Sequence, residues 1–130
     1  MILVDSNVWY AYLDTNDHFH KQAVEVIESA NKLVLPYAVL LEVATLLAYR
    51  ISKTVADNFI MIAVNINEIM IIDNDTDKEL FYFLNHKTKM SFADYSLSYL
   101  SSQYGFELRT FDKQLERFAK KNKAKVVTLL

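Results

Sequence analysis

The sequence of 130 residues predicts an α/β fold: a three-layer sandwich in which helices cover both faces of a mostly parallel sheet of about five strands. Short apolar runs rich in β-branched residues alternate along the chain with longer segments of helical periodicity. Apolar residues make up 52% of the chain, which is enough for a core, and one glycine and one proline leave little room for long loops. We therefore expect a single domain over residues 1–130.

Five short apolar runs have the length and composition of buried strands. They are Ile2–Val4, Lys32–Leu35, Ile69–Ile72, Phe106–Thr110 and Val126–Thr128. Pro36 is expected to stop the second run, because proline cannot donate a hydrogen bond to a neighbouring strand. Since helical segments separate the strands, the connections should be right-handed crossovers between parallel strands.

Seven segments between these strands are expected to be helical. They are Val8–Leu13, His20–Ala30, Tyr37–Arg50, Thr54–Asn65, Thr76–Leu84, Ser91–Tyr104 and Asp112–Lys121. Two of them begin with the pattern of a capping box, Thr76 with Glu79 and Ser91 with Asp94. Gly105 stands where a helix commonly ends in a left-handed residue.

Four acids from distant segments are expected at one edge of the sheet. Asp5 directly follows the first strand, and Asp112 comes two residues after the fourth. Asp94 lies in the first turn of a helix and Glu42 in the second turn of another, and both helices begin at the carboxyl edge of the strands. This edge is where open α/β sheets bind their ligands.

Each acid also has an explanation that involves no ligand. Asp5, Asp94 and Asp112 can cap helices, and Glu42 can lie on a narrow polar stripe that faces water. Caps alone give no reason to gather the charges, because two of them about 4 Å apart repel by roughly 4 kcal/mol at an effective dielectric of about 20. A divalent Mg²⁺ or Mn²⁺ ion, which prefers oxygen ligands, would offset that repulsion.

These acids lie in short motifs that occur in a fixed order along the chain. The motifs are Asp5-Ser6-Asn7, Glu42, Ser91-Phe-Ala-Asp94 and Thr110-Phe-Asp112. In this order and spacing they resemble the PIN-domain ribonucleases, most closely the toxin components of VapBC-type toxin–antitoxin pairs. The resemblance covers essentially the whole chain and implies a PIN-like fold and a metal-dependent endoribonuclease, a hydrolase.

The resemblance also implies roles for single residues and partners. Asp5, Glu42, Asp94 and Asp112 would be the catalytic acids that hold Mg²⁺ or Mn²⁺. Asn7 and Thr110 match positions that support the acids by hydrogen bonds. RNA would be the substrate, and a cognate antitoxin is a possible partner.

Two other kinds of protein remain as alternatives. A phosphoacceptor receiver domain has a similar open sheet. It needs adjacent acids after the first strand, however, and Asp5 stands alone there. Asp73 would be only a weak phosphate acceptor. A PIN-like module that only binds a partner would need none of the acids, so their presence favours an enzyme.

Positive charge is concentrated at the end of the chain. Residues 109–130 carry a net charge of +5 and the first 108 residues a net charge of −7. Arg109, Lys113 and Arg117 are candidates to contact RNA phosphates. The alternatives are an ordinary solvated helix face or a surface for an acidic segment of an antitoxin.

Apolar helices in the middle of the chain predict a homodimer. The segment Tyr37–Arg50 is apolar on nearly every side, and the next helix carries Phe59, Met61 and Ile62 on more than one face. A helix that is apolar all round is normally buried all round. A symmetric second copy is the commonest way to cover the side that a small domain leaves open.

Several features exclude other functions. The absence of cysteine excludes disulfides and thiolate chemistry, and together with the lack of a targeting segment it predicts a cytoplasmic protein. The longest nearly uncharged stretch falls short of the roughly 20 residues of a membrane span and contains Glu42. Asp73–Asp77 begins like a calcium loop, but Lys78 and Leu84 replace its required glycine and glutamate. His18 and His20 lack a third ligand nearby, so they are not expected to form a metal site.

Overall fold

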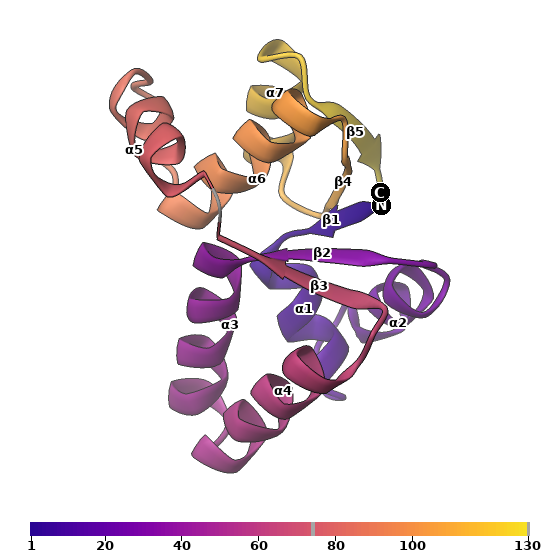
Figure 1. Cartoon of the computed structure of the whole chain (residues 1–130). Helices are drawn as coiled ribbons and strands as arrows, with labels where there is room; N and C mark the ends of the chain where they lie inside the picture. Colours follow the sequence, from indigo (N-terminus) through magenta and orange to yellow (C-terminus); the bar gives the residue numbers. More distant parts are fainter. Residues whose placement is uncertain (74, 130) are drawn as a thin grey trace.

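Five parallel strands form the central sheet of the computed structural model, which describes residues 1–73 and 75–129 (Figure 1). They are β1 (Ile2–Val4), β2 (Leu33–Pro36), β3 (Ile69–Ile72), β4 (Glu107–Thr110) and β5 (Lys125–Thr128). Their order across the sheet is β3-β2-β1-β4-β5, and every neighbouring pair is parallel. The predicted α/β class and the mostly parallel sheet of about five strands are confirmed.

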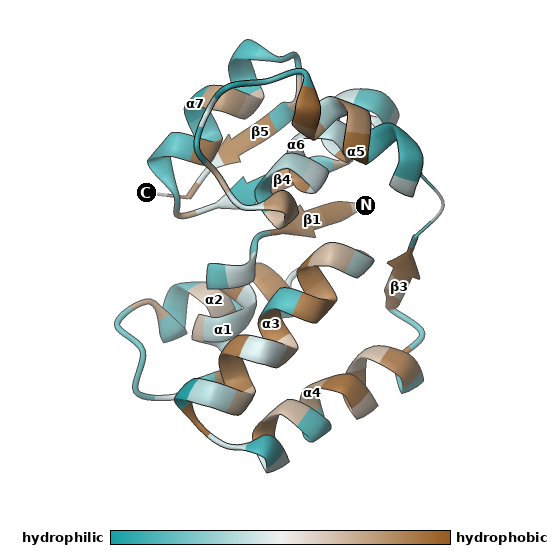
Figure 2. Ribbon diagram, turned by 90° about the vertical axis from the view of Figure 1, so that its left-hand side faces the viewer, coloured by the Kyte–Doolittle hydropathy of each residue, from teal (hydrophilic) through white to brown (hydrophobic). Residues whose placement is uncertain are grey.

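Seven helices lie within the described residues and cover both faces of the sheet. They are α1 (Ser6–Leu13), α2 (His20–Glu28), α3 (Tyr37–Arg50), α4 (Lys53–Asn65), α5 (Thr76–Leu84), α6 (Phe92–Tyr104) and α7 (Lys113–Lys121). Figures 1 and 2 show α1 to α4 on one side of the strands and α5 to α7 on the other. None of the helices in residues 1–73 and 75–129 has the length and hydropathy needed to cross a bilayer.

The strand order places a switch point at β1. From β1 the chain adds β2 and then β3 on one side, and later returns to add β4 and β5 on the other. Ligand sites in open sheets lie where the order reverses in this way, beyond the carboxyl ends of the strands. The order also differs from the 2-1-3-4-5 order of receiver domains, so the receiver alternative is wrong.

The core lies between the sheet and the two helical layers. Leu3 and Leu35 of the sheet are fully buried, as are Trp9 of α1, Leu47 of α3 and Leu97 of α6. The α6 helix is the most enclosed, with every residue from Tyr95 to Ser101 buried. Helix packing on both faces therefore holds the ends of the strands rigidly, which is what a site at this edge requires.

Some local expectations were wrong. Thr76 does not cap its helix: it is the first residue of α5, and the N-cap residue is Asp75, whose side chain makes no capping hydrogen bond. Glu79 is buried and accepts a hydrogen bond from the Ser96 hydroxyl of α6, so a tertiary contact replaces the local capping box. Pro36 belongs to β2, where it pairs with Ile72 and also precedes α3.

A few further boundaries differ by one or two residues. The α4 helix begins at Lys53 because Ser52 accepts a hydrogen bond from the Val55 amide. Phe59 of that helix is almost fully buried, so it is not one of the residues that a second copy could cover. The Ser91 cap and the left-handed Gly105 of α6 are confirmed.

Candidate active site

Asp5 is the most enclosed of the four acids. It is only 2% exposed and caps α1, its Oδ1 accepting a hydrogen bond of 3.0 Å from the Val8 amide. The register of β1 against β4 pairs Val4 with Arg109, so Asp5 lies beside the next residue, Thr110. The Thr110 hydroxyl donates a hydrogen bond to Asp5 Oδ2.

Asp112 is tied to the same pair of residues. Its backbone amide donates a hydrogen bond of 2.9 Å to Thr110 Oγ1. Its Oδ1 caps α7 by accepting hydrogen bonds from the amides of Gln114 and Leu115, at 2.8 and 3.3 Å. A single Oδ1 atom makes both capping bonds, and Oδ2 makes none within the described part of the chain.

Asp94 and Glu42 come from helices on opposite faces of the sheet. Asp94 is the third residue of α6, and its amide donates a hydrogen bond of 3.1 Å to the capping hydroxyl of Ser91. Glu42 lies in the second turn of α3 next to the buried Val43 and is itself half-buried. Both helices therefore direct an acid toward the carboxyl edge that β1 and β4 share.

The pKa values show that the four carboxylates interact. Burial raises the pKa of Asp5 to about 6; hydrogen bonds from Thr110 and Val8 oppose the rise, and the charges of Asp112 and Glu42 add to it. Burial also raises the pKa of Asp94 to about 7, and the charges of Asp5, Asp112 and Glu42 contribute to that rise. All four acids thus lie within range of mutual repulsion at one edge of the sheet.

The acids come together without forming a closed metal site. In residues 1–73 and 75–129, no three histidine, aspartate or glutamate side chains lie close enough to hold an ion as they stand. The donor set is nonetheless made entirely of carboxylate oxygens, which suits Mg²⁺ or Mn²⁺. The raised pKa values of Asp5 and Asp94 reflect buried negative charge that a cation would compensate, so the residues fit such an ion.

The sequence matches the PIN domain over residues 2–121. The chain belongs to the PIN domain family. No curated protein sequence matches it significantly.

Three solved structures have a fold similar to that of this chain. VapC20 of Mycobacterium tuberculosis, a toxin described as cleaving the sarcin–ricin loop, superposes with a TM-score of 0.80 at 21% identity over 91% of this chain and 95% of that one. FitAcB of Neisseria gonorrhoeae gives a TM-score of 0.65 at 17% identity over 99% and 98% of the two chains. PAE2754 of Pyrobaculum aerophilum gives 0.61 at 16% identity over 98% and 90%.

The two residues expected to support the acids differ in their contacts. Thr110 makes the hydrogen bonds described above. Asn7 is exposed, and its side chain makes no hydrogen bond to an acid within the described residues, although it lies beside Asp112 in the wall of one cavity. Ser6, which lies between Asp5 and Asn7 in the sequence, is buried, and its hydroxyl has no hydrogen-bond partner in residues 1–73 and 75–129 of this PIN domain.

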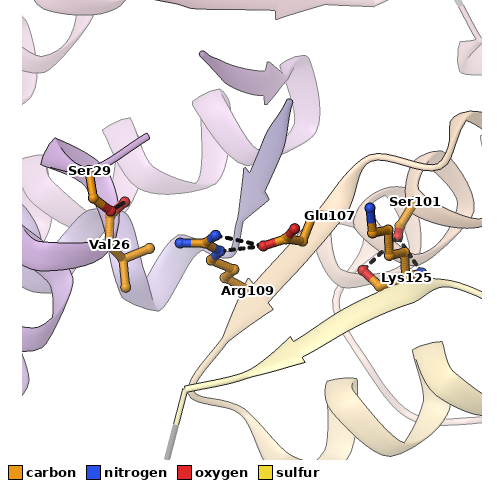
Figure 3. Close-up of polar contacts among 6 residues, drawn as sticks. All are labelled: Val26, Ser29, Ser101, Glu107, Arg109 and Lys125. Atoms are coloured by element: carbon orange, nitrogen blue, oxygen red, sulfur yellow. Dashed lines mark hydrogen bonds and ion pairs between the residues drawn. The ribbon is translucent and has the colours of Figure 1, made fainter. Parts of the chain in front are cut away.

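The three basic residues proposed from the sequence lie in different surroundings. Figure 3 shows Arg109 turned toward Glu107, with which its guanidinium forms an ion pair at 2.6 and 2.7 Å. Lys113 and Arg117 are exposed on the first two turns of α7, directly after Asp112. The role of all three toward RNA stays a prediction, and Arg109 is the one already held by an acid.

Three residues near the acids were not singled out from the sequence as site residues. Phe19, Arg50 and Phe111 line a cavity together with Asn7 and Asp112. Arg50 ends the helix that carries Glu42, so its position eight residues after that acid was the available signal. Phe19 lies in a connection whose path no local pattern predicts.

Proposed function

We propose that this PIN domain, over residues 1–130, is a metal-dependent endoribonuclease that hydrolyses RNA phosphodiester bonds. The observation that carries the proposal is the convergence of four carboxylates from four separate elements, where burial and the charges of the other three acids together raise the pKa of Asp94 to about 7. The PIN family and the similarity to VapC20, described as cleaving the sarcin–ricin loop, support it. Asp5, Glu42, Asp94 and Asp112 are the proposed ligands of Mg²⁺ or Mn²⁺.

Such an ion lowers the pKa of a bound water and stabilises negative charge on the phosphoryl group. Hydrogen bonds within the chain keep the proposed ligand carboxylates in position. Val8 and Thr110 fix the Asp5 carboxylate, and the first turn of α7 fixes one oxygen of Asp112. Because these groups are locked by backbone amides and a buried hydroxyl, little reorganisation is needed when substrate binds.

We further propose that the protein is the toxin of a toxin–antitoxin pair and that it acts as a homodimer in the cytoplasm. Much of α3 and α4 is hydrophobic along the ribbon in Figure 2. Leu41 and Tyr49 of α3 and Met61 and Val64 of α4 are between 49% and 88% exposed. An apolar surface of this kind supports either a second copy or an antitoxin, and we assign the α3 and α4 surface to the second copy.

Cleavage of a pool of structured RNAs, with EDTA, Mg²⁺ or Mn²⁺ added, tests the activity. Cutting is expected only with a divalent ion. Asp94→Asn should remove it, whereas Asp57→Asn, on the exposed face of α4, should leave it intact. Full activity in excess EDTA would overturn the metal-dependent mechanism, and a folded protein that cuts no RNA would favour the non-catalytic module.

A further inference from the structure

A cavity of about 260 Å³ begins where the acid cluster ends. Asn7 and Asp112 form part of its wall, so it opens beside one of the four acids. Aromatic rings and one arginine line most of the rest. The cavity therefore joins positive charge and flat apolar surfaces to a site proposed to cut RNA.

The aromatic part of the wall is a stacked pair. The rings of Phe19 and Phe111 lie 4.9 Å apart between centroids, at an interplanar angle of 20°. Both side chains are half-buried, so the pair is anchored yet partly accessible from the cavity. Phe111 lies between Thr110 and Asp112, which fixes this aromatic surface next to the acids.

The cationic part of the wall is Arg50, at the C-terminal end of α3. Its guanidinium carbon lies 5.5 Å from the centre of the Tyr10 ring, an arrangement typical of a cation–π contact. No carboxylate within the described residues forms an ion pair with it. Arg50 is therefore positioned by Tyr10 while its hydrogen-bond donors stay available. Arg109 differs, because two of its guanidinium nitrogens already contact the Glu107 carboxylate.

We propose that this cavity binds one unpaired nucleotide of the RNA next to the cleaved bond. Its base lies against the Phe19 and Phe111 pair, and Arg50 contacts the adjoining phosphate. The proposal rests on the proposed function in one respect, that the acids beside the cavity cut RNA.

Shape and charge favour this occupant. A pocket of 260 Å³ is below the size typical of drug-sized ligands and suits a single nucleoside. A base can reach aromatic side chains only when it is unpaired and unstacked. Asp17 also lines the cavity, where its carboxylate accepts a hydrogen bond of 2.8 Å from the Phe19 amide and so fixes the backbone that carries the Phe19 ring.

The phosphate contact is tested with Arg50→Gln and the matched control Lys53→Gln, which removes a charge three residues away outside this cavity. Binding of a labelled single-stranded oligoribonucleotide is measured in EDTA at several salt concentrations. Arg50→Gln should weaken binding roughly tenfold, because it removes hydrogen bonds to a charged group. The slope of log affinity against log salt should also fall by about 0.7, and the control should change neither quantity.

The base contact is tested by combining Phe111→Leu with RNAs in which each position in turn lacks its base. Phe111→Leu keeps an apolar side chain of similar size and removes the flat ring, and its melting temperature reports whether the fold is kept. One abasic position should weaken binding to the wild-type protein at least about fivefold. The same position should have no further effect in Phe111→Leu, because the two changes remove one contact.

The outcomes separate this proposal from the proposed function. If Arg50→Gln behaves like Lys53→Gln, or if every abasic RNA weakens both proteins equally, the nucleotide site is overturned even when the wild-type protein cleaves RNA with Mn²⁺. If the wild-type protein cuts no RNA, the proposed function fails, and the binding measurements in EDTA still decide whether the cavity holds a nucleotide.

Discussion

The Thr110 hydroxyl joins two acids of the site: it donates a hydrogen bond to Asp5 and accepts one from the Asp112 amide. The first bond lowers the pKa of a buried carboxylate that desolvation raises. The second fixes the start of α7, and with it the Asp112 side chain. One side chain at the end of β4 thus favours the charged form of one acid and fixes the position of another.

Thr110→Val should therefore weaken both stability and activity. Valine has nearly the same shape but leaves Oδ2 of Asp5 without a donor and the Asp112 amide without an acceptor. The free energy of unfolding should fall by about 1–3 kcal/mol, as expected for unsatisfied buried polar groups. Urea unfolding measures this loss, and RNA cleavage should fall with it.

Thr128→Val is the matched control for that substitution. Thr128 lies in β5 and is exposed, and its hydroxyl contacts Glu116 and Lys120 rather than an acid of the site. It should change unfolding by less than about 0.5 kcal/mol. Equal losses in the two variants would show that Thr110 has no special role.

The raised pKa values of Asp5 and Asp94 predict how the metal-free protein responds to pH. Because the folded state keeps these protons up to about pH 6 and 7, whereas the unfolded chain loses them near pH 4, the folded state binds more protons in this interval. The free energy of unfolding in EDTA should therefore fall as pH rises from about 4 to 7 and level off above it. Chemical unfolding at several pH values measures the slope.

Asp94→Asn isolates the contribution of the acid with the higher pKa. It should flatten the pH dependence and raise the melting temperature in EDTA at pH 8, since it removes one charge from the cluster. Adding Mg²⁺ should stabilise the wild-type protein by binding the folded state, and should stabilise the variant much less. A variant that melts lower than wild type in EDTA at pH 8 would place the repulsion elsewhere.

The positions of three acids could be predicted because local rules determine them. Asp5 and Asp112 each follow a strand and cap the next helix, and Asp94 follows a serine cap, so chain direction alone takes all three to the carboxyl edge. Glu42 was more difficult, because its orientation depends on how α3 packs against its neighbours. The helix period alone allowed it to face water instead.

Other features depend on contacts between distant segments. Glu79 seemed suited to a capping box by its spacing, but the Ser96 hydroxyl, seventeen residues away, binds its carboxylate instead. Arg109 was assigned to the site from its closeness to Asp112 in the sequence. In a strand, however, residues two apart share a face, and its ion pair with Glu107 follows from that period of two.

The exposed apolar residues of α3 and α4 predict that the protein is a dimer in solution. Light scattering at micromolar concentration should give twice the mass of one chain. Met61→Glu places a charge on a side chain that is 60% exposed in one chain, so it should produce monomers without unfolding the protein. Lys121→Glu, at the exposed end of α7 on the other side of the sheet, is a control that should remain dimeric. A wild-type protein of monomeric mass would contradict this prediction.

Lys113 and Arg117 test how RNA approaches the acids. Without metal the acid cluster repels phosphate, so affinity must come from positive charge near it, and these two exposed side chains follow Asp112 on α7. Replacing both with glutamine should weaken RNA binding and reduce the salt dependence of log affinity by up to about 0.7 for each lost phosphate contact. The rate at saturating RNA should change much less, because the acids are untouched.

The matched control replaces Lys121 and Lys123, which lie at and beyond the opposite end of the helix. An equal effect of both double substitutions would mean that general charge, rather than this part of α7, attracts the RNA, and no effect of either would favour a surface that binds an acidic segment of an antitoxin.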